Sequence, residues 1–429
     1  MTEQAEVTQQ GRPLPRALTP FRSPSYRKLA LALVLQTLAA GVWVVALVWE
    51  VIRIGGGPGQ LSIVSTCAAV GVVLPALLGG VVADRIPQKS ILLVVATIEL
   101  AGMALVALLS LTGTTEIWHL AVVSFVSGAG MAFYYPAYSA WLPAMVAEED
   151  LLAVNGFEGM VRPTIGQAIG PGLAGVIVGA ASPGSAFTVA AVCSAAGVLA
   201  LAVVPKTPVR RDLEALTEQH PVASAISDMA EGFRYMVRTP WLLATLLFAS
   251  LMVLVMMGPL EVLVPFLIKD KLGGGPRDHA LVLAAFGVGG AIGSIIMASR
   301  PMPRRYLTVM NLMWGVGCVP FVVMGVTSHI WVVVACGFVL GVLFSGPMVI
   351  WGTLLQRRVP PDLLGRVASL DFFVSVSLMP VSMALAGPVA DLIGLRTTFF
   401  IAGIAPTVFA VAAILLWRLP EDEIANPLT

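Results

Sequence analysis

Twelve apolar runs of membrane-spanning length follow one another along this chain, in two groups of six. They lie at roughly 27–52, 60–83, 89–111, 117–141, 151–181 and 184–204, and then at roughly 241–268, 279–299, 305–327, 330–355, 363–393 and 397–417. A helix needs about 20 apolar residues to cross the hydrocarbon core of a bilayer. Backbone polar groups are satisfied there only in helices or closed barrels. The pattern therefore predicts an all-α membrane protein with 12 transmembrane helices in two pseudo-symmetric six-helix bundles.

Composition supports a membrane location and argues against several other classes of protein. Hydrophobic residues make up 58% of the 429 residues and charged residues only 11%, whereas soluble domains carry about 25% charged residues. The net charge of +1 indicates no nucleic-acid partner. The four cysteines lie inside apolar runs, and no histidine pair has metal-ligand spacing, so we expect no disulfide and no metal site. Without a Gly-Lys dipeptide there is no P-loop, and we expect no cofactor and no enzyme activity.

The distribution of Lys and Arg predicts the orientation in the membrane. If the N-terminus is cytoplasmic, 19 of the 25 Lys and Arg residues lie on inner segments, five on outer segments and one, Arg162, within a span. Cytoplasmic segments carry the excess of these residues, so both termini are predicted to be cytoplasmic.

The spans and their loops divide the chain into five segments. We expect a cytoplasmic N-terminal tail at 1–26, a six-helix bundle at 27–204, a cytoplasmic linker at 205–239, a second six-helix bundle at 240–418 and a cytoplasmic tail at 419–429. Within the linker, apolar side chains recur at helical spacing at Ile226, Met229, Phe233 and Met236. This spacing predicts an amphipathic helix at the membrane surface.

Sequence repeats relate the two groups of spans. Asp150 and Asp362 each begin an Asp-Leu-Leu string before a new span, where Asp is a good helix N-cap. Both spans that follow contain a Gly-Pro pair. Similar strings also end the second and eleventh spans, PALLGGVVADRI and MALAGPVADLIG, yet they fall on opposite faces of the membrane. Inverted repeats are typical of transporters, so we expect alternating access around a central cavity.

The fifth span carries charges and small residues together. Glu158 and Arg162 are spaced for contact on one helical face. The span then runs into Gly166, Gly170, Pro171, Gly172 and Gly175. Glycines let another helix approach closely, proline bends the axis, and a charge in hydrocarbon indicates a functional site. We interpret this span as a place where two halves of the protein meet and move.

The loop after the second span carries a motif that resembles the major facilitator superfamily. The matching residues are Gly80, Asp84, Arg85 and Lys89, in the pattern Gly-x-x-x-Asp-Arg-x-x-x-Lys. The resemblance implies the fold of that superfamily and a latch between the cytoplasmic ends of neighbouring helices. Pro87 stands where a second glycine is usual and Gln88 where a basic residue is usual, which implies a weaker latch. The alternative is an ordinary positively charged inner loop.

The fifth span resembles the antiporter motif of the same superfamily. The matching residues are Gly166, Gly170, Pro171 and Gly175, with Ala174 in place of a glycine. The resemblance implies proton-coupled export and close packing of this span against the glycine-rich eighth span. The alternative is a generic contact between helices with small residues.

Further strings resemble the branch that contains macrolide, tetracycline and other multidrug efflux pumps, as well as siderophore exporters. These strings are FYYPAYSAWLPAMV, EGFRYMVRTP, GPLEVLVPF and LLQRRVPPDLLGRV. Many members of the branch carry an acid in the middle of the first span. This chain reads GVWVVALV there and has no acid in that span before Glu50, which puts the usual coupling residue in doubt here.

A transporter without a nucleotide site must draw on an ion gradient. A buried carboxylate is a natural proton carrier, because burial disfavours its charged form. Our candidates for proton coupling are Glu158, Arg162, Glu261, Glu99 and Asp371. Glu158 and Arg162 form either a proton switch or a static ion pair. Glu261 lies in the seventh span, which the resemblance places at the cavity.

The other charged residues have simpler alternatives. Glu99 is about 15 Å into the third span, but the resemblance implies that this span is peripheral, so a structural polar contact is the alternative. Asp371 lies near the inner end of the eleventh span, where pairing with Arg366 is the alternative. Glu50 and Arg53 near the outer end of the first span, like Lys269 to Lys271, are interpreted as interfacial charges.

The resemblance also implies that the first, fourth, seventh and tenth spans form the cavity walls. The expected cavity residues are Trp43, Phe133, Tyr134, Tyr135, Tyr138, Met252, Met256 and Phe344. Aromatic and Met side chains make an adaptable apolar surface for bulky ligands. For Tyr138, Trp141 and Trp351 the alternative is an interfacial aromatic belt.

These observations favour a bacterial cytoplasmic-membrane exporter that moves bulky hydrophobic drugs outward in exchange for protons. Its expected partners are a small-molecule substrate, protons and the lipid bilayer, and the resemblance implies a monomer. A siderophore or metabolite exporter of the same fold is the alternative, although Arg162 is the only cationic side chain expected in the cavity. A membrane sensor or assembly protein without transport activity is the alternative from another class.

Overall fold

The structure, a computed structural model, describes residues 16–76, 82, 86–142, 145–147, 150–205, 221–360 and 363–428. These residues form helices and connecting turns and contain no strand. Eleven continuous helical stretches, some of them made of two or more of the elements named below, are long and apolar enough to cross a membrane. The second predicted span appears as a shorter apolar helix, Pro58–Val73. The predicted all-α membrane fold is confirmed.

The first half of the chain begins with a short 3-10 helix and continues with the helices of the first bundle. In order these are η1 (Arg16–Arg22), α1 (Pro24–Arg53), α2 (Pro58–Val73), α4 (Gln88–Thr112), α5 (Ile117–Trp141), α6 (Leu151–Val161), η4 (Arg162–Ile169), α7 (Gly170–Ala180) and α8 (Pro183–Ala202). Ser23 caps α1, because its hydroxyl accepts the Tyr26 N–H at 3.3 Å.

The second half begins with a linker helix. In order its elements are α9 (Pro221–Arg238), α10 (Pro240–Gly258), η6 (Pro259–Leu263), α11 (Val264–Phe266), η7 (Leu267–Lys271), α12 (Pro276–Ala298), α13 (Tyr306–Gly317), α14 (Pro320–Val326), α15 (Ile330–Arg358), α16 (Leu364–Ser377), α17 (Met379–Ile393), α18 (Leu395–Leu416) and α19 (Leu419–Ala425). Some predicted spans consist of several consecutive elements, because prolines interrupt the helical hydrogen bonds. The seventh span, for example, consists of α10, η6, α11 and η7.

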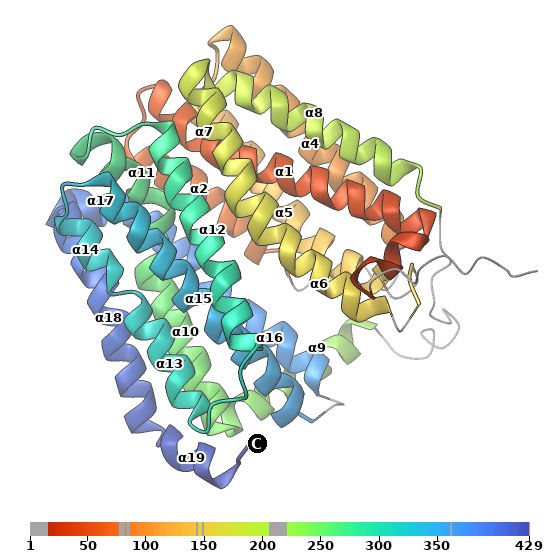
Figure 1. The fold of residues 1–429 in the computed structure, drawn as a ribbon, viewed down its shortest axis with the longest axis vertical. Helices are drawn as coiled ribbons and strands as arrows, with labels where there is room; N and C mark the ends of the chain where they lie inside the picture. Colours follow the sequence, from red (N-terminus) through yellow and green to blue (C-terminus); the bar gives the residue numbers. More distant parts are fainter. Residues whose placement is uncertain are drawn as a thin grey trace, which may run out of the picture.

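Two helical bundles, one from each half of the chain, lie side by side (Figure 1). In the first, α1 packs on α8 and α2 on α5, while in the second α12 packs on α15 and α13 on α18. The bundles meet along two seams, α2 with α17 and α7 with α12. Both seams contain glycine contacts. A Cβ at Gly387 would lie 2.8 Å from Gly59 Cα, and one at Gly175 would lie 2.5 Å from Ala280 Cβ.

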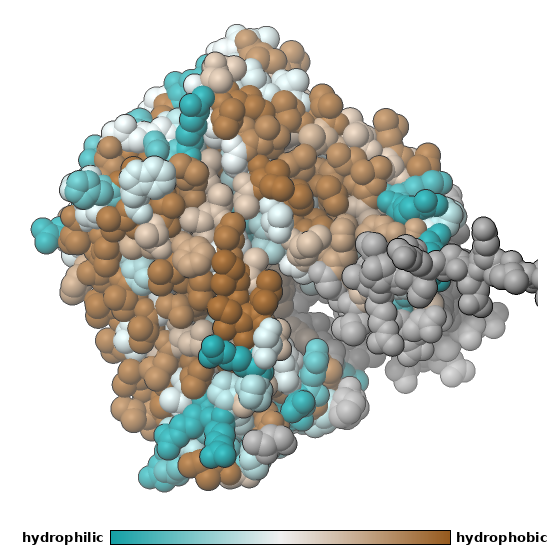
Figure 2. All heavy atoms as spheres, viewed as in Figure 1, coloured by the Kyte–Doolittle hydropathy of each residue, from teal (hydrophilic) through white to brown (hydrophobic). Residues whose placement is uncertain are grey.

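These glycine contacts lie near one end of the molecule, close to the turns at 54–57, 181–182 and 272–275, which we call the closed end. Toward the other end, which carries η1, α9 and α19, the two bundles diverge (Figure 1). Within the described part of the chain, neither α5 nor α6 packs extensively on α15 or α16 there. We call this the open end, and the space-filling view is hollowed where the bundles separate (Figure 2).

The segments assigned to tails and linker carry folded elements. At the C-terminal end, α19 packs beneath the second bundle. Buried Glu423 accepts the N–H groups of Leu307 and Thr308 at 2.9 and 3.2 Å, and Asp422 pairs with Arg358 at 2.5 Å. The carboxylate of Glu423 therefore satisfies the free N–H groups at the start of α13.

The predicted amphipathic helix is α9, and it packs on α10 and α16. Met236 is buried, Phe233 is exposed, and Glu231 pairs with Arg366 at 2.5 Å. The side chains of Ile226 and Met229 lie outside the described residues.

Close backbone packing between α12 and α15 gives a stability prediction. A Cβ at Gly341 would lie 2.0 Å from Phe286 O, whereas a Cβ at Gly352, in the same helix, has no neighbour within 4 Å. We expect Gly341→Ala to destabilise the protein by about 1–3 kcal/mol through overpacking. Gly352→Ala should be neutral or stabilising by up to about 1 kcal/mol through helix propensity. Thermal unfolding in detergent measures both, and equal melting temperatures would contradict this packing.

Candidate functional site

The fifth predicted span is a bent helix made of α6, η4 and α7. Its middle, η4, is π-helical, and the N–H of Gly170 accordingly donates to Ile165 O. Pro163 and Pro171 have no N–H to donate, so the regular hydrogen-bond ladder is broken on both sides of η4. The wider π-helical turn changes the direction in which side chains point. Glu158, before it, and Gly175, after it, therefore face different neighbouring helices.

The small residues of this span contact both bundles. A Cβ at Gly170 would lie 2.8 Å from Gly41 Cα of α1, and Gly166 lies beside Thr37 of the same helix. Across the seam, Gly175 lies against Ala280, and a Cβ at Gly287 would lie 3.0 Å from Pro163 O. The motif thus packs against α1 in its own bundle and against α12, the predicted eighth span.

Glu158 and Arg162 lie on one face of the helix, at its open-end half. The Arg162 Nη2 and Glu158 Oε2 atoms are 3.9 Å apart, and the two side chains are 40% and 15% exposed. This distance is at the limit of an ion pair, so the guanidinium is near the carboxylate without a tight hydrogen bond. Arg162 also lies over the exposed ring of Tyr135, with its Cζ 5.1 Å from the ring centroid.

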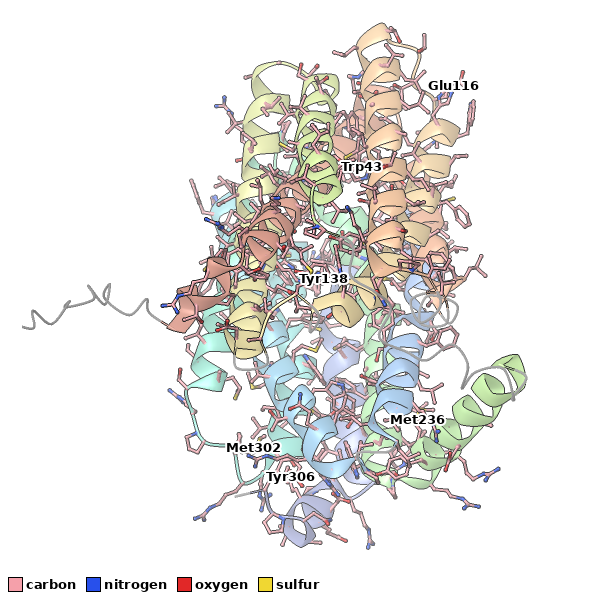
Figure 3. The ribbon with its side chains drawn as sticks, turned by 90° about the vertical axis from the view of Figure 1, so that its right-hand side faces the viewer. Trp43, Glu116, Tyr138, Met236, Met302 and Tyr306 are labelled. Atoms are coloured by element: carbon pink, nitrogen blue, oxygen red, sulfur yellow. The ribbon has the colours of Figure 1, made fainter. Side chains whose placement is uncertain are left out.

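Glu158 sits among buried hydroxyl groups. Its Oε1 atom and the hydroxyls of Tyr26 and Tyr138 are buried, and none makes a hydrogen bond of regular geometry with a described residue, although the Tyr138 hydroxyl lies beside the carboxylate. Tyr138 stacks on Tyr134 with ring centroids 6.0 Å apart. Figure 3 places Tyr138 about midway along the molecule, between Trp43 and Tyr306. Unpaired buried polar atoms are costly, so this cluster is poised to take up a proton, a water or a polar ligand group.

Aromatic side chains enclose this cluster near the open end. Phe21 of η1 packs edge-on against Tyr26 and Phe157, with ring centroids 5.2 and 5.1 Å apart. Thr19 donates a short hydrogen bond to Asp150, which ties η1 to the start of α6. Sequence reasoning missed Phe21 and Tyr26, because no spacing relates them to Glu158.

Glu99 of α4 lies closer to this cluster than a peripheral span suggests. A Cβ at Gly130 of α5 would lie 3.7 Å from Glu99 Oε1, and Gly130 is one helical turn from Tyr134. The missing side chain at Gly130 therefore makes room for the carboxylate.

Glu261 lies at the boundary between the bundles. Its segment, η6, contacts α17 in its own bundle and α2 in the other. Glu261 is exposed, whereas its neighbours Pro259 and Val262 are buried. An exposed carboxylate within a span is unfavourable in lipid, so this position favours the space between the bundles.

Asp371 is held by neutral donors. The Trp351 indole N–H donates to Asp371 Oδ2 at 3.0 Å, and the Ser375 hydroxyl donates to Oδ1 at 3.4 Å. The alternative of an Asp371–Arg366 pair is wrong, because Arg366 pairs with Glu231 of α9. The belt interpretation is also wrong for Trp351, as for Tyr138 and Trp141, because these side chains are 7%, 2% and 1% exposed.

The latch motif falls largely outside the described residues, which exclude Gly80, Asp84 and Arg85. Lys89 is described, and its ammonium group donates to the Ala202 carbonyl at 2.7 Å and to the Val204 carbonyl. It thus binds free carbonyls at the C-terminal end of α8, where a cation is favourable.

The expected cavity residues divide into two groups. Trp43, Phe133, Tyr134 and Phe344 are half-buried and Tyr135 is exposed, so their surfaces are partly free. Met252 and Met256 are only 3% and 1% exposed and pack inside the second bundle, as Tyr138 does inside the first. In this conformation, therefore, neither methionine offers a surface to a ligand.

The interpretation of Glu50 as an interfacial charge is wrong. Glu50 is fully buried, accepts two hydrogen bonds from Arg53 at 2.7 and 2.8 Å, and accepts one from the Ser110 hydroxyl at 2.9 Å. The pair joins α1 to α4 near the closed end. Lys269 and Asp270, in contrast, form an exposed pair at 2.8 Å.

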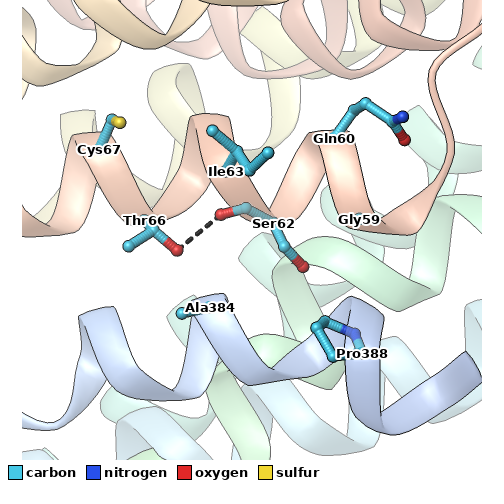
Figure 4. A pocket seen from close by; sticks show the side chains of 8 residues that line it. All are labelled: Gly59, Gln60, Ser62, Ile63, Thr66, Cys67, Ala384 and Pro388. Carbon is cyan, nitrogen blue, oxygen red and sulfur yellow. Dashed lines mark hydrogen bonds between the residues drawn. The ribbon is translucent and has the colours of Figure 1, made fainter. Parts of the chain in front are cut away.

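A pocket of about 500 Å³ opens at the α2–α17 seam (Figure 4). Its lining includes Ser62, Ile63 and Thr66 of α2 with Ala384 and Pro388 of α17, and the Thr66 hydroxyl donates to Ser62 O at 2.6 Å. None of the expected cavity residues lines it. Within the described part of the chain, no group of three His, Cys, Asp or Glu side chains is arranged to hold a metal.

Comparison with known proteins identifies the family. The family described as transmembrane secretion effector, a major facilitator family, matches residues 16–428. The chain belongs to this family. It is 26% identical to the multidrug efflux pump Tap of Mycolicibacterium fortuitum over 90% of this chain and 94% of that protein. It is 23% identical to macrolide efflux protein A of Streptococcus pyogenes over 80% and 85%.

Solved structures show the same fold. A variant of the nucleoside transporter NupG superposes with a TM-score of 0.72 over 91% of this chain and 99% of that one, at 11% sequence identity. The similarity establishes the major facilitator fold for this family member.

Proposed function

We propose that this protein is a secondary transporter that exports bulky hydrophobic compounds across the bacterial cytoplasmic membrane in exchange for protons. The observation that carries the proposal is Glu158, a carboxylate within a span that lies beside Arg162 and two buried tyrosine hydroxyls, those of Tyr26 and Tyr138. The names of the relatives, a multidrug pump and a macrolide efflux protein, support the substrate class.

The orientation follows from charge. The open end carries η1, α9 and α19 and the segments rich in Lys and Arg, which favours a cytoplasmic position for this end and for both termini. The structure would then correspond to an inward-facing state. Opening of the glycine-lined seams at the closed end, with closure of the other end, would complete alternating access.

The chemistry of exchange would centre on Glu158. When the cavity faces outward, the carboxylate takes up a proton and Arg162 is freed from its negative partner. When the cavity faces inward, Arg162 and the bound substrate favour loss of the proton to the cytoplasm. The proton gradient thereby biases the cycle, because the two states bind protons differently.

Reconstituted protein tests the proposal. Proteoliposomes loaded with a panel of macrolides, dyes and other hydrophobic drugs should release them only when a proton gradient of the correct sign is imposed. An ionophore that removes the gradient is the control and should stop release. If no compound moves under any gradient, drug export is wrong, and a siderophore or metabolite becomes the substrate class to test.

A further inference from the structure

The second bundle contains a carboxylate that corresponds to Glu158 but has a different environment. In the first bundle, Tyr138 of α5 lies 12 residues before Asp150, and Glu158 follows that Asp by eight. In the second, Trp351 of α15 lies 11 residues before the matching Asp-Leu-Leu string, and Asp371 follows that string's Asp by nine. In the structure the Tyr138 hydroxyl lies beside Glu158 and the Trp351 indole N–H donates to Asp371, so each bundle places an aromatic side chain with a polar hydrogen next to an acid on the following span.

The two acids differ in their charged neighbours. Arg162 lies 3.9 Å from Glu158, whereas Asp371 has no cationic partner among the described residues and accepts only from the Trp351 indole and the Ser375 hydroxyl. Arg358 of α15 and Arg366 of α16, on the helices that carry Trp351 and Asp371, are engaged elsewhere. The Cζ atom of Arg358 lies 4.7 Å from the ring centroid of Trp241, and its guanidinium group pairs with Asp422. Arg366 pairs with Glu231.

Asp371 is also rigidly presented. Trp351 is 7% exposed and packs edge-on against Trp241, with ring centroids 6.1 Å apart. Ser250 of α10 donates to Val374 O at 3.0 Å, which fixes α16 next to α10. The indole N–H is therefore held toward the carboxylate by packing, so little side-chain entropy is lost when a ligand binds.

The helix that carries Asp371, α16, borders the opening between the bundles (Figure 1). Asp371 is half-buried, and the next residue, Phe372, is 53% exposed. Its helix, α16, also touches α2 of the other bundle. An unpaired carboxylate at such a place is stabilised by a positive charge, because the low dielectric strengthens the attraction.

We propose that Asp371 binds the positively charged group of cationic lipophilic substrates and that Trp351 positions it. The proposal rests on the proposed export function and names a substrate class for it. Neutral substrates use the same opening without this contact. Glu158 serves the proton and Asp371 the substrate cation, so the two acids have separable roles.

Transport of two probes tests this division. Ethidium carries a permanent positive charge, and chloramphenicol is uncharged. In proteoliposomes, Asp371→Asn should lower ethidium export at least about tenfold, since one lost charge contact of about 1.4 kcal/mol corresponds to that factor. Export of chloramphenicol should stay within about twofold. Asp391→Asn, an exposed acid on the same predicted span, is the matched control and should leave both probes unchanged.

Trp351→Phe keeps an aromatic ring but removes the indole donor. We expect it to raise the KM for ethidium several-fold and to leave the KM for chloramphenicol unchanged, a difference that a general packing defect would not produce. Equal loss of both probes in Asp371→Asn, or loss of neither, would overturn the proposal.

Ethidium binding to the purified protein separates this proposal from the export function. Fluorescence anisotropy should show binding to the wild type that weakens in Asp371→Asn and persists in Asp391→Asn. If wild-type vesicles export neither probe but this binding pattern holds, the export function is wrong while the cation site stands. If wild-type protein exports chloramphenicol but Asp371→Asn binds ethidium as the wild type does, the cation site is wrong while export stands.

Discussion

Glu158→Gln should abolish proton-driven export while leaving the protein folded. Glutamine keeps the size of the side chain but cannot gain or lose a proton, so the carboxylate near Arg162 no longer responds to the gradient. Gradient-driven export should fall at least about tenfold. A difference of one pK unit in proton binding between the two states of the cycle already corresponds to a tenfold change in an equilibrium constant. The measurement is release of a macrolide or dye from proteoliposomes with an imposed gradient.

Substrate exchange measured without a proton gradient tests whether Glu158→Gln is folded and still binds and moves substrate. Glu158→Gln should still exchange labelled for unlabelled substrate at equal concentrations, since this step needs the alternating movement but no net proton transfer. Glu116→Gln, an exposed acid at the start of α5, is the control and should behave as the wild type in both assays. Gradient-driven export by Glu158→Gln at the wild-type rate would remove Glu158 from the coupling mechanism.

Gly175→Leu should hold the closed end apart. A Cβ at this position would lie 2.5 Å from Ala280 Cβ and 2.9 Å from Pro276 O, so the α7–α12 seam must separate to fit a larger side chain. Overpacking costs about 1–3 kcal/mol, and a bias of that size changes a conformational equilibrium about 5- to 150-fold. We expect export to fall accordingly, because the inward-facing state can no longer form readily.

Distance measurements distinguish this effect from misfolding. Spin labels at exposed Thr114, in the turn before α5, and at exposed Asp270 of η7, in a background without native cysteines, should move apart in Gly175→Leu. Gly172→Leu is the matched control, since a Cβ at Gly172 of the same helix has no neighbour within 4 Å. If Gly175→Leu has the wild-type label distance and exports at the wild-type rate, the seam is not a moving contact.

The fifth span shows why local motifs can be interpreted without a structure. Glycine and proline act through the backbone, so Gly166, Gly170, Pro171 and Gly175 predict close packing and a bend wherever the span is placed. Its partners were harder to predict. The contact with α12 was expected, whereas the equally close contact of Gly170 with Gly41 depends on how α1 crosses the span.

Burial of single charged side chains could not be predicted from position along a span. Glu50 stands near the end of its helix, where charges usually face the interface, but Arg53 and Ser110 satisfy it in the interior. Pairing of Asp371 with Arg366 was the alternative to a role in proton coupling, yet Arg366 pairs with Glu231 of α9. These choices depend on which helix ends lie together, and sequence spacing contains no information about that.

From sequence alone, this chain is determined to be a helical membrane protein with two groups of six apolar segments and a charged, glycine-rich fifth span, because hydropathy and backbone chemistry act locally. The tertiary structure decided which polar groups meet. It gathered Glu158 with Tyr26 and Tyr138, and Asp371 with Trp351, from different helices. The physical reason is that hydrogen bonds and ion pairs act over a few ångströms, so they depend on how the helices pack.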